Sequence, residues 1–347
     1  MVRRFPPHPL PLTLLHALDW INTNPHLTPE APVAKLLPKA DWIWKDGEFI
    51  PWDEAKVHIM SLAVQFGSSV FEGIRCYRTS QGPAIFRLRD HLRRLRDSCR
   101  IYRMDLAYSP DQLAEACVAV VERNGFESCY VRPLVLRSLG QGMNPIGIPI
   151  EVYIPCYPWG TYLGEGALEN GVDACVSNWQ RMEPNTFPAM AKSAGHYNNA
   201  QLIKMDAVLN GYAEAIALGP GGLLSEGSGE NVFLVKNGIL FTPVLDGTEL
   251  WGITRDTILT LAREMEIPVR EQPIPREMLY TADEVFVTGT AAEVTPLRSV
   301  DKLKIGEGGR GPITRKLQER YLATVRGQVP DRHGWLTLVP RPVAAAR

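Results

Sequence analysis

Strand-turn-strand patterns followed by helices constrain the fold of this chain more than any other sequence feature. Asp46-Gly47 lies within the stretch WIWKDGEFIPW, and Asn237-Gly238 lies within NVFLVKNGILF. Both pairs tolerate the left-handed backbone of a tight turn, so each stretch is predicted to form a β-hairpin. Two more strands are expected at Ile74–Arg78 and Ala84–Arg87, around Ser80-Gln81-Gly82. Hairpins followed by helices, in place of strict β-α alternation, predict an α+β architecture.

Three helices are expected where apolar residues recur with helical spacing. Asp90 is predicted to cap the first helix. Ser109-Pro110-Asp111-Gln112 opens the second with a capping box, and Gly125 ends it. The third is expected over Thr254–Glu266. The predicted inward faces are Leu92, Leu95, Cys99 and Tyr102; Leu113, Cys117, Val120 and Val121; and Ile258, Leu261, Ala262 and Met265.

A segment with several glycines marks the expected division of the chain. Cys129–Leu136 and Glu151–Tyr157 have the apolar pattern of buried strands, and Pro158–Gly171 follows them. The chain is therefore divided into an N-terminal extension, a small domain, a linker and a large domain, at 1–40, 41–160, 161–170 and 171–347. The extension lacks the clean apolar core of a signal peptide. We interpret it as disordered or as the product of a wrongly chosen start.

Charge and cysteine usage exclude several classes of protein. Lysine plus arginine total 37 against 38 acidic residues, a net charge of −1. A neutral chain has no overall field that holds a polyanion, which argues against nucleic acid as a partner. No run approaches the ~20 apolar residues of a membrane span, and no spacing typical of metal ligands is present. Six cysteines without a CxxC pair are typical of reduced, buried thiols in a cytosolic protein.

Two segments could hold an anion. Seven arginines and two aspartates lie between Arg87 and Arg103. They could form a solvated helix face or a nucleic-acid surface, or one arginine could turn inward to hold a phosphate. Trp251-Gly252-Ile253-Thr254 brings a glycine and a hydroxyl to a predicted helix N-terminus. That segment favours either a bound phosphate or simple capping by Thr254.

Three further residues could carry chemistry. Lys192 has small neutral neighbours in AKSAG, and Tyr197 lies five residues further on. A lysine removed from water can form a Schiff base with a carbonyl compound, although most lysines are simply solvated. Glu226 stands between glycines just before a strand. Its carboxylate could pair with a cationic ring nitrogen, or it could be a turn residue. Gly289-Thr290-Ala291-Ala292 offers a turn with open backbone N–H groups.

Eight motifs occur in order between Trp42 and about Arg326: FEGIRCY (Phe71–Tyr77), FRLRDHLRRL (Phe86–Leu95), YVRP (Tyr130–Pro133), PWGTYLG (Pro158–Gly164), AKSAGHY (Ala191–Tyr197), SEGSGENVF (Ser225–Phe233), GITRD (Gly252–Asp256) and GTAAEVTP (Gly289–Pro296). This stretch closely resembles the branched-chain amino acid aminotransferases, which are fold type IV enzymes that use pyridoxal 5'-phosphate. The resemblance implies two α+β domains: a small α/β N-terminal domain and a larger, β-rich α/β C-terminal domain.

The resemblance also implies roles for the candidate residues. Lys192 would be the catalytic residue that holds the cofactor aldehyde and moves the substrate proton. Glu226 would keep the pyridine nitrogen protonated, and Tyr197 would hydrogen-bond the ring hydroxyl. Arg94 would bind the phosphate while its neighbouring arginines face solvent. The cofactor-binding set is Arg94, Lys192, Tyr197, Glu226, Gly229, Ile253, Thr254 and Thr290. No metal is expected.

A second implied set forms the substrate pocket. Its members are Phe71, Gly73, Trp159 and Tyr162 around an aliphatic side chain, Tyr130 with Thr290 and Ala291 at the α-carboxylate, and Arg132 at the distal carboxylate of glutamate. A pocket that accepts both leucine and glutamate needs an apolar wall with one reachable arginine. Phe66 stands where bacterial relatives often carry tyrosine, at the pocket edge. The loop Ser138–Pro145, which in the family reaches a neighbouring subunit, is variable here.

The expected activity is transamination between L-leucine, L-isoleucine or L-valine and 2-oxoglutarate, in biosynthesis or degradation of branched-chain amino acids. A D-amino acid aminotransferase, an aminodeoxychorismate lyase of the same fold, and a binding protein that lost the chemistry are the alternatives. The family implies small-molecule partners, a cytoplasmic location, and a homodimer or a larger homo-oligomer such as a hexamer.

Overall fold

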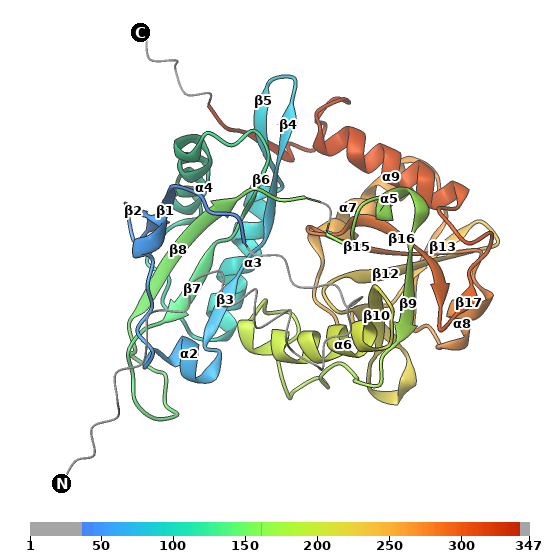
Figure 1. Cartoon of the computed structure of the whole chain (residues 1–347), viewed down its shortest axis with the longest axis horizontal. Helices are drawn as coiled ribbons and strands as arrows, with labels where there is room; N and C mark the ends of the chain where they lie inside the picture. The colour runs from blue at the N-terminus through green and yellow to red at the C-terminus, as the bar shows by residue number, and fades with distance from the viewer. Residues whose placement is uncertain (1–36, 161, 341–347) are drawn as a thin grey trace, which may run out of the picture. The chain divides into compact units, whose positions relative to one another are not determined.

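Two β-sheets with attendant helices organise the chain (Figure 1). The computed structural model describes residues 37–160 and 162–340, so the predicted extension lies outside the described residues except for 37–40. Strands before residue 158 form the first sheet, and strands after residue 171 form the second, apart from the last strand of the chain. Each sheet contains hairpins and is accompanied by helices, which confirms the predicted α+β architecture.

The first sheet has the strand order β18-β5-β4-β6-β8-β1-β2, with β3 and β7 joined beside β8. Its hairpins β1–β2 and β4–β5 turn at the two predicted places. The last strand, β18, was not predicted, and it pairs antiparallel with β5. The bounds are β1 Trp42–Lys45, β2 Glu48–Pro51, β3 Ser69–Phe71, β4 Ile74–Thr79, β5 Gly82–Phe86, β6 Cys129–Val131, β7 Leu134–Arg137, β8 Ile150–Tyr157 and β18 Leu336–Leu338.

One predicted strand is divided in the structure. The stretch Cys129–Leu136 forms β6 and β7, separated by Arg132-Pro133. A proline has no N–H to donate to a sheet, so the ladder cannot continue through it. As a result β6 pairs with β4 while β7 pairs with β3, and both pair with β8. The division places Arg132 at the junction of two strands.

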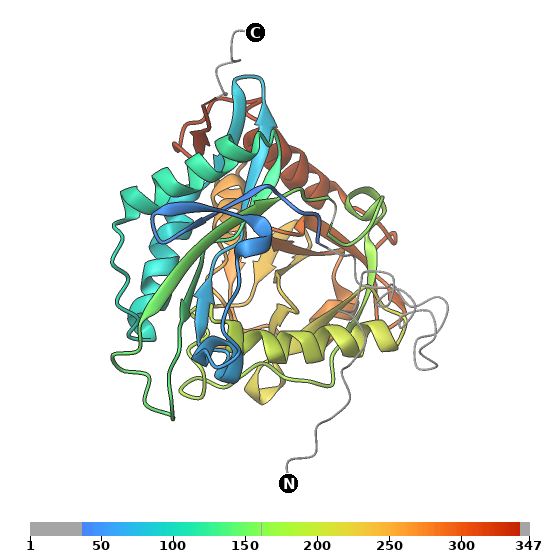
Figure 2. The same cartoon turned by 60° about the vertical axis from the view of Figure 1, so that its left-hand side comes forward.

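Helices α3 (Leu88–Ile101) and α4 (Pro110–Asn124) pack against each other beside the first sheet (Figure 2). The predicted capping box that opens α4 is confirmed, and Gly125 ends the helix in a left-handed conformation. The predicted cap of α3 is wrong. Arg87 occupies the N-cap with φ 53°, because β5 runs directly into the helix. Asp90 lies in the first turn, where its carboxylate accepts a 2.7 Å hydrogen bond from Arg87 Nε.

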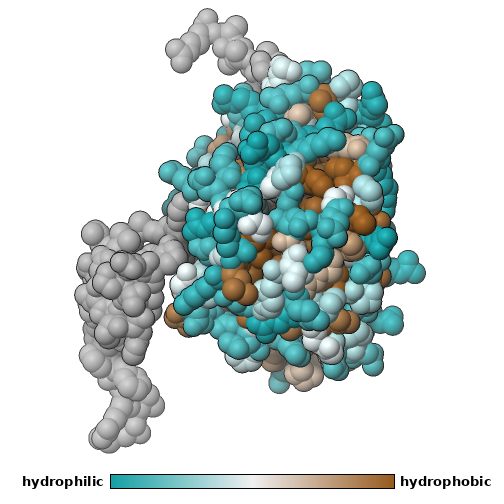
Figure 3. All heavy atoms as spheres, turned by 90° about the vertical axis from the view of Figure 1, so that its right-hand side faces the viewer, coloured by the Kyte–Doolittle hydropathy of each residue, from teal (hydrophilic) through white to brown (hydrophobic). Residues whose placement is uncertain are grey.

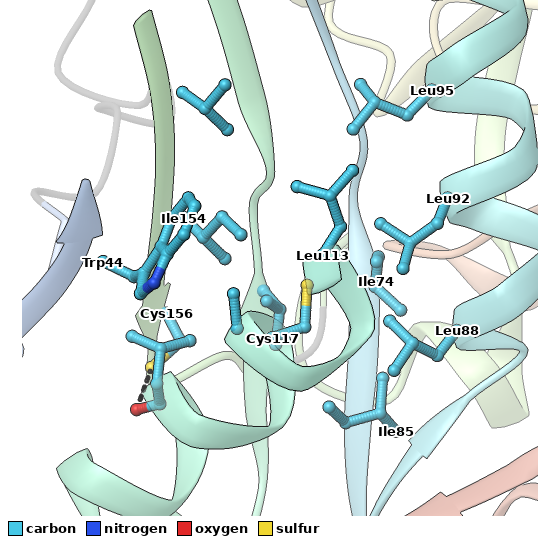
Figure 4. Close-up of a cluster of buried hydrophobic side chains, with 14 of the residues drawn as sticks. Trp44, Ile74, Ile85, Leu88, Leu92, Leu95, Leu113, Cys117, Ile154 and Cys156 are labelled. Atoms are coloured by element: carbon cyan, nitrogen blue, oxygen red, sulfur yellow. Dashed lines mark hydrogen bonds between the residues drawn. The ribbon is translucent and has the colours of Figure 1, made fainter. Parts of the chain in front are cut away.

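Apolar side chains from these helices fill the space over the first sheet (Figure 4). Leu92 and Leu95 on α3 point toward Leu113 and Cys117 on α4, and Ile154 on β8 lies on the far side of them. The residues that periodicity predicted to face inward are buried here, with Tyr102 partly so. The sheet and helices of this half therefore share one core.

The second sheet has the order β11-β10-β9-β16-β15-β12-β13-β14, with β17 beside β16. Because β11 also pairs with β12, six of its strands close into a ring. The predicted hairpin at Asn237-Gly238 joins β12 to β13, and both turn residues have positive φ. The bounds are β9 Val172–Val176, β10 Glu214–Leu218, β11 Leu224–Gly227, β12 Asn231–Lys236, β13 Ile239–Thr242, β14 Val269–Glu271, β15 Glu284–Gly289, β16 Glu293–Val300 and β17 Leu303–Lys304.

The predicted helix at Thr254–Glu266 is α7 (Ile253–Glu264), with Met265 at its C-cap. The other helices of the described residues are α2 Leu62–Phe66, α5 Ala167–Asn170, α6 Tyr197–Leu209, α8 Glu277–Thr281 and α9 Pro312–Val325, with short 3-10 turns η1 Trp52–Glu54, η2 Ala194–His196 and η3 Pro220–Gly222. Helix α6 packs against β10 and begins directly after η2. The segment expected to divide the chain, Pro158–Gly171, lies between β8 and β9. The domain bounds drawn from it stay a prediction.

The molecular surface and the cysteines can be compared with the expectations from composition. Hydrophilic residues cover most of the face in Figure 3, with hydrophobic residues gathered in patches between them. Helices long and apolar enough to cross a membrane are absent from the described part of the chain. All six cysteines are free and buried, as predicted.

Candidate active site

One cavity is lined by residues of both halves of the chain. Its walls include every residue of the predicted cofactor-binding and substrate sets: Phe71, Gly73, Arg94, Tyr130, Arg132, Trp159, Tyr162, Lys192, Tyr197, Glu226, Gly229, Ile253, Thr254, Thr290 and Ala291. Residues more than 200 positions apart in the sequence thus meet at one place. The individual roles of these side chains stay predictions, and the contacts below describe what each could do.

Lys192 lies in the loop before η2 and is tied to the first sheet through its backbone. Its N–H donates to Ser98 Oγ at 2.9 Å, and its carbonyl accepts from the N–H of Phe71 at 3.0 Å. The Lys192 amine is hydrogen-bonded to the Tyr197 hydroxyl at the start of α6, and it lies 5.1 Å from the centroid of the Phe71 ring. The amine and the phenol therefore share the cavity, as their spacing suggested.

Glu226 on β11 is buried, and its carboxylate has several partners. One oxygen accepts from Arg181 Nη2 at 2.7 Å. The other accepts from the N–H of Leu250 at 3.0 Å and from Asn231 Nδ2 at 3.3 Å. Burial raises the pKa of Glu226, and the guanidinium of Arg181 opposes that rise. Such a carboxylate can serve as a hydrogen-bond acceptor for a cationic nitrogen in the cavity.

Arg94 is the arginine of α3 that turns toward the cavity. Its Nε and Nη2 donate to the two oxygens of the fully buried Glu72 at 2.7 and 2.8 Å, and Nη1 donates to the Trp251 carbonyl at 2.8 Å. Burial alone would raise the pKa of Glu72, but Arg94 and His91 hold it well below its usual value. A guanidinium has five N–H groups, so two remain to bind an anion.

The other arginines of this helix largely face solvent, with one exception that sequence reasoning missed. Arg87 is buried, and its guanidinium contacts Asp90 and Asp256 at 2.7 and 2.6 Å. It forms ion pairs between α3 and α7. The expectation that all neighbours of Arg94 are solvent-facing is therefore wrong for Arg87, because its guanidinium donates to Asp256 and Thr257 of α7.

The N-terminus of α7 provides a second group of anion donors. Gly252 is its N-cap, and no side chain caps the helix, so the alternative that Thr254 is a capping residue is wrong. A Cβ on Gly252 would lie 1.8 Å from Asn231 Oδ1, so any larger residue would force Asn231 or the start of α7 to move. Free N–H groups at a helix start, together with the two spare N–H groups of Arg94, fit a phosphate.

Aromatic rings form another part of the cavity lining. Trp159 stacks on Tyr130 with ring centroids 4.6 Å apart, and Tyr162 stacks on Trp159 at 6.1 Å. Gly73 lies so close that an added Cβ would be 1.8 Å from the Tyr130 hydroxyl oxygen. The guanidinium carbon of Arg132 lies 4.6 Å from the Phe71 ring centroid. Within residues 37–160 and 162–340, no carboxylate pairs with Arg132.

Several lining residues were missed by sequence reasoning. Arg181 carries a positive charge, Glu230 is a buried acid, and His196 is neutral because burial and Arg181 lower its pKa to about 4. Burial and the nearby carboxylate of Glu214 raise the pKa of Glu230 to about 8. Glu230 and His196 lie within the motifs SEGSGENVF and AKSAGHY but were assigned no role there, and Arg181 lies outside all eight motifs. Phe66, which was expected at the pocket edge, is half exposed on α2 and lies outside the cavity lining.

Comparison with known proteins shows which family this chain resembles. The family model described as amino-transferase class IV matches residues 69–300. A protein named branched-chain-amino-acid aminotransferase from Salmonella typhimurium is 51% identical over 300 residues, covering 86% of this chain and 97% of that protein.

Solved structures agree. The crystal structure of the Escherichia coli branched-chain amino acid aminotransferase matches with a TM-score of 0.86 at 50% identity, covering 87% of this chain and 100% of that chain. The crystal structure of the branched-chain amino acid aminotransferase from Thermobaculum terrenum in PLP-form (holo-form) matches with a TM-score of 0.81 at 35% identity, covering 87% of this chain and 99% of that chain. Residues 69–300 contain every residue that lines the cavity.

Proposed function

The chain belongs to the class IV aminotransferase family, and we propose that it exchanges amino groups between L-leucine, L-isoleucine or L-valine and 2-oxoglutarate. The products are the branched-chain 2-oxo acid and L-glutamate. One observation carries the proposal: the Lys192 amine shares a cavity with an aromatic wall that bears the guanidinium of Arg132. The names of the similar proteins support branched-chain amino acids as substrates.

The cavity fits pyridoxal 5'-phosphate. The spare N–H groups of Arg94 and the uncapped start of α7, at Ile253 and Thr254, suit the phosphate, and Thr290 and Gly229 lie beside them in the lining. Glu226 suits a protonated ring nitrogen, and Tyr197 suits the ring hydroxyl. When bound, pyridoxal phosphate supplies an electron sink for negative charge at the substrate Cα.

Lys192 is the proposed proton carrier of the reaction. Its amine accepts the proton from the substrate Cα and returns it on the cofactor side. The Tyr197 hydroxyl holds the amine in place through their hydrogen bond. Glu226, ion-paired with Arg181, would accept the hydrogen bond of a protonated ring nitrogen. Tyr197 thus orients the Lys192 amine, and Arg181 keeps a positive charge beside the Glu226 carboxylate.

The substrate wall explains how one pocket accepts two kinds of substrate. Tyr130 and the turn Thr290-Ala291 take the α-carboxylate common to both. Phe71, Gly73, Trp159 and Tyr162 enclose an aliphatic side chain, and Arg132 pairs with the distal carboxylate of glutamate or 2-oxoglutarate. A guanidinium stacked on Phe71 keeps its edges free for such a carboxylate.

We further propose a homo-oligomer in the cytoplasm. The loop Ser138–Pro145 exposes Leu139 and Met143 beside α2, and such apolar groups are typical of a subunit contact. Six free, buried thiols support a reducing compartment.

Substrate choice tests the proposal. Purified protein with pyridoxal phosphate should be yellow and should transaminate L-leucine with 2-oxoglutarate much faster than D-alanine. Lys192→Ala should abolish this turnover while it leaves the protein folded. Preference for D-alanine would indicate the D-amino acid aminotransferase instead, and release of pyruvate from aminodeoxychorismate would indicate the lyase. Substantial turnover by Lys192→Ala would refute the assigned role.

A further inference from the structure

A strained residue ends the turn that faces the proposed carboxylate site. The hairpin β15–β16 turns through Thr290, Ala291 and Ala292, and Gly289 pairs with Glu293 at its base. Glu293 has φ 56°, in the left-handed region where glycine is favoured. A side chain in this region costs free energy and persists only where its surroundings hold it.

Contacts of the Glu293 side chain hold this residue in its left-handed conformation. It is only 9% exposed, and its Oε1 accepts a 2.9 Å hydrogen bond from the Tyr77 hydroxyl. Arg75 Nη1 lies 4.0 Å from the same oxygen, and the Arg75 guanidinium lies over the Tyr77 ring at 4.8 Å. Arg75 and Tyr77 both belong to β4 of the first sheet, whereas Glu293 opens β16 of the second. The strained residue is therefore held from the other sheet.

These contacts lie beside Tyr130, one of the residues proposed to bind the substrate α-carboxylate. Arg75 is paired in register with Tyr130 on the neighbouring strand β6. Tyr130 and the turn Thr290-Ala291 reach the cavity from different sheets. A carboxylate held by both requires a fixed spacing between those sheets, and Glu293 contacts β4 just behind this point.

Tyr77 also contacts a residue of α9. The Tyr77 hydroxyl lies 3.4 Å from the Tyr321 hydroxyl on α9. All four residues, Arg75, Tyr77, Glu293 and Tyr321, are buried. Buried polar groups that contact one another in this way favour one arrangement of β4, β16 and α9, the elements that carry them.

We propose that Glu293 is a positioning residue that holds the turn Thr290-Ala291 at the correct distance from Tyr130, so that both grip the substrate α-carboxylate. This inference rests on the proposed function, since it assumes that a carboxylate binds at the turn. The side chain of Glu293 acts through Tyr77 and Arg75 and does not touch the substrate. The contacts of the Glu293 side chain offset the free-energy cost of its left-handed backbone.

Glycine substitution separates the anchor from the strain. Glu293→Gly relieves the left-handed backbone but removes the carboxylate, so a residue that served only the turn would gain stability without loss of binding. Lys302→Gly is the matched control, because Lys302 has φ 66° at the other end of β16 and its side chain is exposed. Tyr77→Phe removes the donor alone, and Glu293→Gln keeps an acceptor of the same length.

The probe is 4-methylpentanoate, the acid that leucine would be without its amino group, titrated into holoenzyme by calorimetry. We expect its Kd to rise about tenfold in Glu293→Gly and at least about threefold in Tyr77→Phe, the range of one lost hydrogen bond to a charged group. Glu293→Gln should stay within about threefold of wild type, and Lys302→Gly should bind as wild type does. The Kd for pyridoxal phosphate should change less than about twofold throughout.

Wild-type acid affinity in both Glu293→Gly and Tyr77→Phe would overturn the proposal, and so would an equal loss in Lys302→Gly. If Glu293→Gly does not fold, Tyr77→Phe alone decides. Failure of the proposed function looks different. In that case the wild-type protein itself would not turn over L-leucine or bind pyridoxal phosphate, whereas failure of this inference leaves both properties intact.

Discussion

Replacing Arg181 by methionine should expose how strongly the fold depends on one buried ion pair. Arg181 is 7% and Glu226 is 6% exposed, and their contact is 2.7 Å long. Methionine fills much of the same volume but leaves the Glu226 carboxylate buried without its cation. Breaking a buried pair from one side costs about 3–5 kcal/mol. The hydrogen bond from Arg181 Nη1 to Asn199 Oδ1 at 3.2 Å is lost as well.

The loss should depend on pH, with a definite sign. Burial already raises the pKa of Glu226, and Arg181 opposes that rise. Without Arg181 the pKa rises further above its unfolded value. A raised acid pKa destabilises the folded state above the unfolded pKa, and the penalty grows as pH increases through the window between the two values. We therefore expect a loss of about 3–5 kcal/mol near pH 8 and about 2 kcal/mol near pH 5, where Glu226 takes up a proton.

The assay is urea unfolding of the cofactor-free protein at both pH values, with wild type measured beside each variant. Arg181→Lys is the control, because it keeps the positive charge and should lose less than Arg181→Met at pH 8. Equal losses at the two pH values would refute the role of Glu226 ionisation. A loss below about 1 kcal/mol at pH 8 would show that the pair contributes no more than an exposed one.

Two further substitutions test the opposite ends of the cavity. Arg132→Ala should reduce kcat/KM for L-glutamate at least about tenfold more than for L-leucine, since only glutamate brings a second carboxylate to the guanidinium; steady-state kinetics with both donors decides, and equal losses would contradict the assignment. Gly252→Ala should weaken pyridoxal phosphate binding at least about tenfold, because its Cβ would lie 1.8 Å from Asn231 Oδ1 and must displace either the start of α7 or Asn231, which donates to Glu226. Fluorescence titration measures the Kd, and unchanged binding would contradict the prediction.

Local chemistry made some features predictable from the sequence. The turn at Asn237-Gly238 and the capping box at Ser109 depend on residues within a few positions of one another, and both are confirmed. Lys192 was noticeable because its neighbours are small and neutral. The predicted cap at Asp90 failed for a physical reason: Arg87 begins α3 in a left-handed conformation, which nothing in its own side chain announces.

The partners of buried charges were not predictable in the same way. Glu72 and Arg94 lie 22 positions apart, and Tyr77 and Glu293 lie 216 apart. A charge removed from water requires a partner, so reading Glu226 as a buried acid already implies a cation nearby. Periodicity and motifs do not say which cation, because the choice depends on how β11 packs against the loop that carries Arg181. The sequence therefore reveals groups that would touch substrate and cofactor, whereas groups that control their ionisation and spacing are revealed only by the fold. Substitutions at that second group should change substrate affinity and pH dependence while the motifs of the first remain intact.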